Sequence, residues 1–361
     1  MTPNDLSIPD SGATPASSGP RPATERTDIR TIARLANVSI ATVSRVMNGV
    51  PTVNAEMARR VWEIVEELDF VPNTQARALV SGRSRIFGLL ISEITNPFFP
   101  ELIQGFEDVA IEHGYEILVS STNYDPRRMT HCIRRMVERK VEGVAVMTFG
   151  IEEPLLDQLA NRQVPLVFID IGPDRPDITL LKVDYRRGIH QAVEHLVRLG
   201  HSRIGFVSGP RHVHSANSRL NAFSSAMALA GLSTRPEWIL EGDHSLDGGA
   251  AAMERLLALP ERPTALLCSN DMTAIGVMHT AWRAGLKVPQ DLSVIGFDDI
   301  HLAAMMMPPL TTVQMSRYDL ARAAFQALRA HAEEPERITA RQEIIIPTEL
   351  VLRESTAPPA E

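Results

Sequence analysis

Residues 29–48, IRTIARLANVSIATVSRVMN, carry the pattern that decides the fold of the N-terminal part of the chain. Four apolar residues recur there at helical spacing and predict a short helix over 29–36: Ile29, Ile32, Ala33 and Ala36. Turn-forming residues follow at 37–39, and Ser39 is a good N-cap for a second helix over 40–47. Two helices joined by so short a turn are typical of the helix-turn-helix, whose second helix lies in the major groove of DNA.

The side chains of the second helix suit contact with DNA. Arg45 is the best candidate for a bidentate bond to guanine, and Ile40 and Ala41 offer apolar contacts to a thymine methyl group. Val43 and Val46 are expected to face inward and hold the helix on its partner. The candidate DNA-contacting residues of this module are Thr31, Ser39, Ile40, Ala41, Thr42, Ser44, Arg45 and Asn48. Spacing alone leaves open an ordinary helical hairpin with a capped second helix.

Two further segments complete this N-terminal region. Asn54 caps a predicted third helix that runs to Leu68, and Trp62 is expected to pack under it. Residues 72–80, PNTQARALV, combine a proline suited to a first helical turn with good helix formers. A helix this short is marginal in water without packing. We therefore expect it to act as a hinge that becomes ordered only when something holds it.

Charge is distributed unevenly along the 361 residues. The formal net charge is -8, but residues 27–85 hold eight Arg and six acidic residues, a net charge of +2 that leaves -10 for the rest. The basic charge therefore falls where DNA contact is predicted, and only the phosphates that it neutralises matter for the salt-dependent part of DNA affinity.

Other features of composition narrow the class of protein. The only cysteines, Cys132 and Cys268, are far apart, so a disulfide scaffold is not expected and a reducing cytoplasm fits. No apolar run is long enough to span a membrane, and residues 1–26 have the composition of a disordered tail. No metal-ligand spacing occurs, and surface or capping roles are expected for His113, His195, His201 and His331.

From Ile86 onward, short apolar runs alternate with amphipathic stretches, which predicts strands alternating with helices. This order implies right-handed crossovers and parallel sheets covered on both faces. About 230 residues of this pattern exceed one typical sheet, so we expect an α/β core of two doubly wound parallel-sheet subdomains.

Polar residues follow several of these predicted strands. Asp170, Asn270 and Asp298 come at strand ends, and Arg219 lies near the start of a helix that follows another strand. Ligands of open parallel sheets sit beyond the carboxyl ends of the strands, and such side chains provide fork-like partners for hydroxyl groups. Asp and Asn at these junctions are equally common as helix N-caps, so spacing alone leaves both roles open.

Several motifs in order resemble the lac repressor/galactose repressor family of bacterial transcription regulators. The motifs are ANVSIATVSRVMN at 36–48, VPNTQARAL at 71–79, GFDD at 296–299, PPLTTV at 308–313 and ELVLRES at 349–355. The resemblance covers nearly everything after residue 26. It implies an all-α three-helix module plus a hinge helix, followed by a core like that of periplasmic sugar-binding proteins.

The same resemblance assigns expected roles to individual residues. It places Asn73, Ala76 and Leu79 of the hinge on DNA, with Leu79 wedged between base pairs in the minor groove. The residues expected to hold a small-molecule effector are Asp170, Arg219, Asn270, Asp298, His244 and Phe98. His244 stands where several members have an aromatic residue that stacks on a sugar. Phe98 has a core role as its equal alternative.

The function implied is a repressor that needs no cofactor and is not an enzyme. It would bind a near-palindromic operator in double-stranded DNA as a homodimer, in the cytoplasm, and a sugar or sugar derivative would switch its affinity. No leucine heptad follows ELVLRES, which favours a dimer over a tetramer. The alternatives are a sugar-binding transport or sensory protein, or a sugar hydrolase using Asp298 and Asp170.

These inferences divide the chain as follows: a tail at 1–26, the helix-turn-helix domain at 27–71, the hinge and linker at 72–85, the effector and dimerisation core at 86–356, and a tail at 357–361. Within the core, the first subdomain is expected at about 86–182 and 314–342, and the second at about 183–313 and 343–356.

Overall fold

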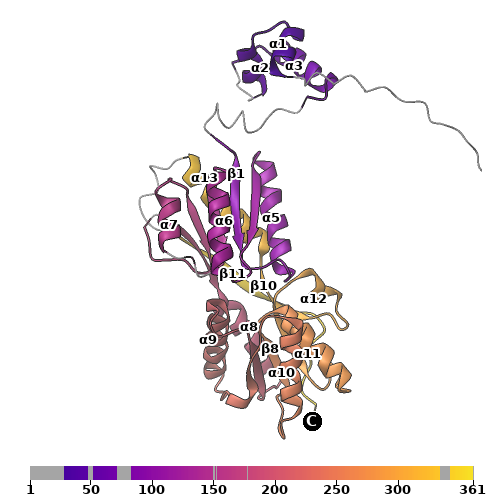
Figure 1. Ribbon diagram of the computed structural model, residues 1–361. Coiled ribbons are helices and arrows are strands. Elements are labelled where there is room, and N and C mark those ends of the chain that lie inside the picture. The colour runs from indigo at the N-terminus through magenta and orange to yellow at the C-terminus, as the bar shows by residue number, and fades with distance from the viewer. Residues whose placement is uncertain are drawn as a thin grey trace, which may run out of the picture. The chain divides into compact units, whose positions relative to one another are not determined.

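The computed structural model describes residues 28–47, 52–70, 83–148, 151, 153–176, 178–333 and 342–360. The chain divides into two units, Met1–Val80 and Ser81–Glu361 (Figure 1). Four expected DNA contacts lie outside the described residues: Asn48, Asn73, Ala76 and Leu79.

Three helices form the first unit: α1 (Ile29–Leu35), α2 (Ile40–Met47) and α3 (Ala55–Glu67). The Ser39 hydroxyl accepts a hydrogen bond from the backbone N–H of Thr42 at 3.1 Å and so caps α2 as expected. The Asn54 side chain likewise accepts from the N–H of Glu56 at 2.8 Å at the start of α3. The three predicted helices are therefore confirmed, with ends within one or two residues of those expected.

A small apolar cluster holds these helices together. Its buried members are Ile32, Ala33, Ala36, Val43, Val46, Val61 and Val65. The inward orientation expected for Val43 and Val46 is thus confirmed. Trp62 is 42% exposed, so the expectation that it packs under α3 is wrong. Val61 and Val65 lie four residues apart on the buried face of α3, whereas Trp62 lies one residue further round the helix.

The second unit contains two lobes, seen one above the other in Figure 1. Lobe 1 comprises β1 (Ile86–Ile91), α5 (Phe98–Glu112), β2 (Glu116–Ser121), α6 (Pro126–Glu138), β3 (Gly143–Met147), α7 (Glu153–Ala160), β4 (Leu166–Ile169), β5 (Ile178–Asp184) and, from later in the chain, α13 (Arg317–Glu333). Lobe 2 comprises α8 (Tyr185–Arg198), β6 (Ile204–Ser208), α9 (His214–Leu229), η1 (Pro236–Trp238), β7 (Ile239–Glu241), α10 (Leu246–Leu257), β8 (Ala265–Cys268), α11 (Asp271–Arg283), β9 (Ser293–Asp298), α12 (His301–Met305) and β10 (Thr311–Met315). The final strand, β11 (Gln342–Val351), belongs to both lobes.

The strands form the order β2-β1-β3-β4-β5-β11-β10-β9-β8-β6-β7. Each lobe therefore repeats the same doubly wound order, with a switch point between β1 and β3 in lobe 1 and between β6 and β8 in lobe 2. All pairings are parallel except that of β10 with β11. The expectation of two doubly wound, mostly parallel subdomains is confirmed.

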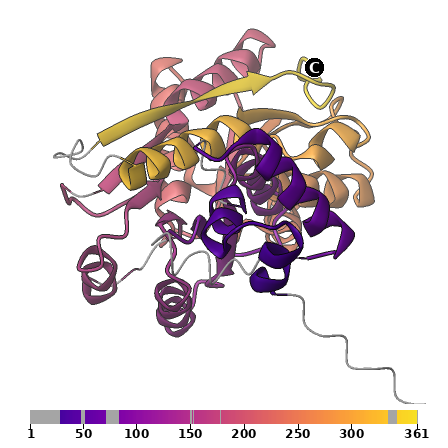
Figure 2. The same cartoon turned by 90° about the horizontal axis from the view of Figure 1, so that it is seen from above.

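Residues of β11 pair with one lobe and then with the other. Gln342 to Pro347 run parallel to β5, and Thr348 to Val351 run antiparallel to β10. Figure 2 shows β11 as the long yellow arrow that leads towards the C-terminal end of the chain. Together with the passage from β5 into α8 and from β10 into α13, this strand joins the two lobes.

The faces of the lobe 1 sheet are covered by different helices. Leu90 and Val144 pack with side chains of α6 and α7 in one cluster, whereas Leu89 and Ile91 pack with side chains of α5 and α13 in another. Adjacent strand residues point to opposite faces, so the apolar runs of these strands serve both clusters.

The chain after β11 is attached to lobe 2. His201 is only 3% exposed, and its ring is bonded to the carbonyl oxygen of Ala357 at 2.8 Å and to the hydroxyl of Thr264 at 2.8 Å. His331 is also buried and is bonded to the Thr179 hydroxyl at 2.9 Å. The surface or capping roles expected for these two histidines are therefore wrong, because each ring is buried and bonded to a hydroxyl group far away in sequence.

Candidate functional site

A cavity of about 90 Å³ lies between the two lobes. Its walls include residues that end or follow the strands at both switch points: Ser92, Met147 and Thr148 in lobe 1, and Asn270 in lobe 2. Ligands of doubly wound sheets bind at such points. The structure also brings together at this cavity all six residues expected to hold an effector: Phe98, Asp170, Arg219, His244, Asn270 and Asp298.

Arg219 is the central cation of the cavity. It projects from α9, is 6% exposed, and donates from Nη2 to Oδ1 of Asp298 at 3.2 Å and from Nη1 to the carbonyl oxygen of Ser269. Its guanidinium lies 4.0 Å from the ring centroid of Phe297 and 5.1 Å from that of Tyr185. Aromatic faces and carboxylates together stabilise a buried guanidinium.

The two carboxyl groups that accompany Arg219 have environments that oppose ionisation. Burial raises the pKa of Asp298 to about 6, although the charges of Arg219 and Arg317 act to lower it. Burial also raises the pKa of Asp170, against a hydrogen bond from the Tyr185 hydroxyl and the charge of Arg219. The positive charge of Arg219 is therefore balanced by the carboxyl groups of the same buried cluster.

His244 presents a neutral ring to the cavity. Burial, and then the charge of Arg219, lower its pKa to about 3. The ring Nε2 is bonded to the Ser269 hydroxyl at 2.9 Å, and an added Cβ at Gly209 would lie only 1.9 Å from that nitrogen. The ring therefore requires a residue without a side chain at position 209.

Asn270 has two bonds that orient its neighbours. Its Oδ1 accepts from the N–H of Thr273 at 2.9 Å, and its Nδ2 donates to the carbonyl oxygen of His244 at 2.9 Å. The N-cap role that the sequence left open is therefore present, and the same side chain also lines the cavity. Asn270 thus ties α11 to the loop that carries His244.

Unusual backbone conformations gather at this cavity. Asp170, His244 and Asp298 have φ values of 74°, 67° and 106°, and Asp299 has a φ of 56°. Non-glycine residues adopt this region at a cost of roughly 1–3 kcal/mol each and persist where their surroundings hold them. Strain of this kind is concentrated at functional sites, which supports a ligand-binding role for the cavity.

The two aspartates of the GFDD motif have different partners, one in the cavity and one outside it. Asp298 faces Arg219, whereas Asp299 pairs with Arg353 at 2.7 Å and accepts from Gln314 at 2.8 Å. The fully buried Asp271 accepts from the N–H of Ile300 at 2.9 Å. These bonds hold the turn after β9, and with it Asp298, in one place.

The lobe 1 wall is more apolar. Phe98 is 4% exposed, meets Phe99 edge to face with ring centroids 5.5 Å apart, and lines the cavity. Both roles considered for Phe98, core and pocket, are therefore present. Met147 and Ile169 add apolar surface to this wall.

Sequence reasoning missed several residues of the cavity: Ser92, Glu93, Tyr124, Tyr185, Ser215 and Met315. Tyr185 matters most, because it is bonded to Asp170 and lies against Arg219. It begins α8, directly after β5 ends at Asp184. The strand-end rule used for the other residues could have identified it.

In the first unit, the described candidates for DNA contact lie on and around α2. Ser39, Ile40, Ala41 and Arg45 are exposed, and Thr42 and Ser44 are half-buried. Ile40 is 46% exposed, so its side chain is available to meet a base. The Thr31 hydroxyl donates to Asp28 at 3.0 Å and helps to cap α1.

Neither a metal site nor a membrane-spanning helix is found in the described parts of the chain. No group of three or more His, Cys, Asp or Glu side chains there could hold a metal ion. None of the described helices is long and apolar enough to cross a membrane.

Comparison with known proteins adds a family assignment. Residues 28–73 match the model for bacterial regulatory proteins of the lacI family, and residues 193–356 match a periplasmic binding protein-like domain. The HTH-type transcriptional repressor PurR of Aliivibrio salmonicida (strain LFI1238) is 36% identical over 301 residues, which cover 83% of this chain and 90% of that protein. The chain belongs to the lacI family of bacterial regulatory proteins.

Two further similarities extend over most of the chain. The ribose operon repressor of Escherichia coli (strain K12) is 34% identical over 308 residues, covering 85% of this chain and 93% of that repressor. The crystal structure of the lac repressor dimer bound to operator and the anti-inducer ONPF is 26% identical, with a TM-score of 0.79, and covers 92% of this chain and all of that chain. This member of the lacI family is therefore a DNA-binding transcriptional repressor, and the helix-turn-helix interpretation of α1 and α2 replaces that of an ordinary hairpin.

Proposed function

We propose that this lacI-family repressor binds a near-palindromic operator as a homodimer, and that an uncharged hydroxylated molecule of sugar type in the interlobe cavity switches its affinity for DNA. The observation that carries this proposal is the cluster of Arg219, Asp298, Asp170 and Tyr185 in that cavity. The cluster offers hydrogen-bond donors and acceptors at fixed positions, as recognition of vicinal hydroxyl groups requires.

The charges around the cavity support an uncharged ligand. Its described lining contains three carboxyl groups, from Glu93, Asp170 and Asp298, and one guanidinium, from Arg219. That guanidinium is already paired with Asp298. A phosphate or carboxylate on the ligand would meet like charges in a poorly hydrated site, which costs several kcal/mol. Sugar phosphates and acidic sugars are therefore disfavoured.

The size of the cavity supports a ligand-linked movement of the lobes. A benzene ring occupies an engineered protein cavity of roughly 150 Å³, and the interlobe cavity here measures about 90 Å³. A six-membered ring therefore requires the walls to move apart. A ligand shifts such an equilibrium only by the difference between its affinities for the two arrangements.

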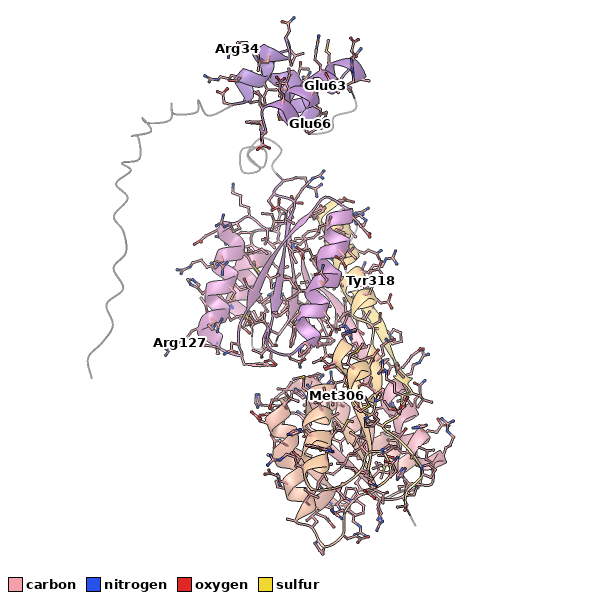
Figure 3. All side chains as sticks on the ribbon, turned by 90° about the vertical axis from the view of Figure 1, so that its right-hand side faces the viewer. Arg34, Glu63, Glu66, Arg127, Met306 and Tyr318 are labelled. Atoms are coloured by element: carbon pink, nitrogen blue, oxygen red, sulfur yellow. The ribbon has the colours of Figure 1, made fainter. Side chains whose placement is uncertain are left out.

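An apolar surface on lobe 2 supports the homodimer. Three large apolar side chains are exposed there, Leu246 at 40%, Trp282 at 74% and Met307 at 91%, around a groove of about 960 Å³. Met306, labelled in Figure 3, also lines this groove. Exposed apolar patches rimmed by polar residues mark association surfaces. We assign this surface to a second copy of the chain, because a two-fold protein matches a two-fold operator.

The proposed contacts with DNA begin at the start of α2. Arg45 would bind guanine, Ile40 and Ala41 would meet thymine methyl groups, and Leu79 of the hinge would enter the minor groove. Coupling of about 1–3 kcal/mol between the cavity and the operator would change operator affinity by roughly 5- to 150-fold. Since operators are cytoplasmic in bacteria, the repressor would act in the cytoplasm.

Selection of genomic DNA fragments by the purified full-length chain tests this proposal. At physiological salt, we expect enrichment of a near-palindrome of roughly 14 to 20 base pairs, two half-sites in adjacent turns. Arg45→Ala should weaken binding of the selected site by about 1–3 kcal/mol and relax one base position. Unchanged preference in that variant would contradict the assignment of Arg45.

The same selection repeated with added small molecules tests the effector. The panel would contain neutral pentoses and hexoses, their phosphate esters, uronic acids and nucleobases. We expect enrichment to change with a neutral sugar and not with any charged derivative. A response to a nucleobase or a sugar phosphate instead would replace the proposed ligand class while leaving the DNA-binding function intact.

A further inference from the structure

A half-buried ion pair connects the cavity to the helix that begins the lobe 1 wall. Glu101 lies in the first turn of α5, three residues after Phe98. Its Oε2 pairs with Nε of Arg317 at 2.9 Å, and its Oε1 accepts from the backbone N–H of His301 at 3.0 Å. Arg317 begins α13 in lobe 1, whereas His301 begins α12 in lobe 2. A single carboxylate therefore bonds to both lobes.

Arg317 makes the second connection between the lobes. Its Nη1 donates to the carbonyl oxygen of Asp298 at 2.7 Å, and the Asp298 side chain is the partner of Arg219 in the cavity. Asp298 has a φ of 106°, a conformation that its surroundings must maintain. The guanidinium of Arg317 thus holds the backbone of a residue that lines the cavity.

Glu101 and Arg317 are partly shielded from water, and the helices that carry them pack closely together. The side chains of Glu101 and Arg317 are 27% and 20% exposed, so water screens them less than it screens a surface pair. α5 and α13 lie close together, since a Cβ on Gly105 would be 3.5 Å from that of Ala321. This close packing fixes the helix ends that carry the two side chains.

We propose that Glu101, Arg317, Asp298 and His301 form an interlobe latch, in which Glu101 and Arg317 are positioning residues of the effector site. The latch keeps the lobes in the closed arrangement and holds Asp298 in the orientation that faces Arg219. Its role in regulation rests on the proposed function, because opening of the latch is the movement that the effector would control. The bonds themselves do not depend on which ligand is bound.

The latch differs from a simple ion pair in a way that can be tested. A simple pair needs only opposite charges, so exchanging them by Glu101→Arg with Arg317→Glu would restore it. The latch also needs an acceptor at position 101 for the N–H of His301 and a donor at position 317 for the carbonyl oxygen of Asp298. Arginine has no acceptor and an ionised glutamate has no donor, so the exchange restores neither bond.

The experiment measures the distance between the lobes in the ligand-free, full-length chain. Spin labels are attached through Arg128→Cys on α6 and Glu254→Cys on α10, both exposed positions. The native Cys132 and Cys268 are 7% and 1% exposed and therefore react poorly with the reagent. Labelled chain is diluted into an excess of unlabelled chain, so that only distances within one chain contribute.

We expect one narrow, short distance for the parent chain. Glu101→Gln keeps an acceptor for the N–H of His301 and should raise the ratio of the longer to the shorter distance less than Glu101→Ala does. Glu101→Ala should raise that ratio by tenfold or more, about 1.4 kcal/mol. Arg317→Gln should do the same, and the charge exchange should resemble Glu101→Ala. The matched control is Glu107→Gln, which removes an exposed carboxylate from the same helix and should leave the distance unchanged.

Amide hydrogen exchange provides a second, local measurement. The N–H of His301 should exchange faster in Glu101→Ala than in Glu107→Gln, with the thermal midpoint of both variants within a few degrees of the parent. An unchanged distance distribution in Glu101→Ala, or recovery of the closed distance by the charge exchange, would overturn the latch. Neither measurement needs an effector, so failure of the sugar panel and failure of the latch are separate results.

Discussion

The two walls of the cavity differ in how their side chains are held. In lobe 2, Arg219, His244 and Asn270 each have hydrogen bonds to other residues of lobe 2. In lobe 1, a larger part of the wall is apolar, and Phe98, Phe99 and Met147 are held by packing. Its polar residues include Thr148, which is bonded to Thr122 at 3.2 Å, and Asp170, which is bonded to Tyr185. Hydrogen bonds fix orientation, whereas apolar contact is largely non-directional. Lobe 2 is therefore suited to select a ligand, and lobe 1 to close over it.

This difference explains where each kind of substitution should act. Changes in the lobe 2 wall should alter stability and ligand selection sharply, because they leave a buried partner without its bond. Changes of shape in the lobe 1 wall should have smaller, graded effects. Four substitutions test that contrast, in order of decreasing effect.

Arg219→Met should destabilise the chain by about 3–5 kcal/mol, because it leaves the buried Asp298 and Asp170 carboxyl groups without their cation. Urea unfolding of the core transition at pH 7 measures the loss. The control is Arg211→Met, which breaks the exposed pair with Glu241 and should cost less than about 1 kcal/mol. Equal losses of unfolding free energy in the two variants would show that the buried pair stabilises the chain no more than the exposed pair does.

Asp298→Asn should weaken binding of the responding sugar by about 1.5–3 kcal/mol, since a hydroxyl group would lose a charged acceptor. Titration calorimetry at pH 7.5 measures this change, and affinity for the selected operator should be retained. Asp108→Asn, on the exposed side of α5, is the charge-matched control. Undiminished sugar affinity in Asp298→Asn would place the ligand elsewhere.

His244→Phe should reduce the loss of stability on acidification from pH 7 to pH 5 by about 1–2 kcal/mol. The folded-state pKa of His244 is depressed from 6.5 to about 3, so the unfolded chain binds a proton below pH 6.5 that the folded chain does not. Stability from this group is therefore lost as pH falls through 6.5. Denaturant unfolding at both pH values measures this change in stability, and His279→Phe on α11 is the control. Identical pH dependence of stability in the parent and in His244→Phe would refute the prediction.

Phe98→Leu in the lobe 1 wall should cost less than about 1.5 kcal/mol of stability and change sugar affinity only slightly, since it roughly conserves apolar volume. Thermal unfolding and calorimetry on the same samples measure both. If this variant affected sugar affinity more than Asp298→Asn, the assignment of selection to lobe 2 would be reversed.

Sequence patterns predicted the elements whose signals are local. Ser39 and Asn54 are caps that act within three residues, and the strands of the core have long apolar runs. The three-residue strand β7 and the single-turn α12 have no comparable signal. The glycines in the first turns of α10 likewise weaken its helical pattern.

The residues of the candidate site could likewise be predicted only where their sequence signal is local. Strand ends nominated Asp170, Asn270 and Asp298, which lie together at the cavity, although their ligand contacts stay a prediction. Gly209 and Glu101 carried no such signal, since their importance depends on neighbours 35 and about 200 residues away, His244 and His301. Trp62 was misassigned because a large apolar side chain on a helix was assumed to be buried, while Val61 and Val65 are the buried residues of α3 in that core.

The shared strand β11 has a consequence for synthesis of the protein on the ribosome. Lobe 1 needs residues 342–347 to complete its sheet, and lobe 2 needs residues 348–351 beside β10. Neither lobe is therefore complete until translation has passed residue 351. The nascent core must wait for its last strand, and a truncation before residue 342 would remove an element from both lobes at once.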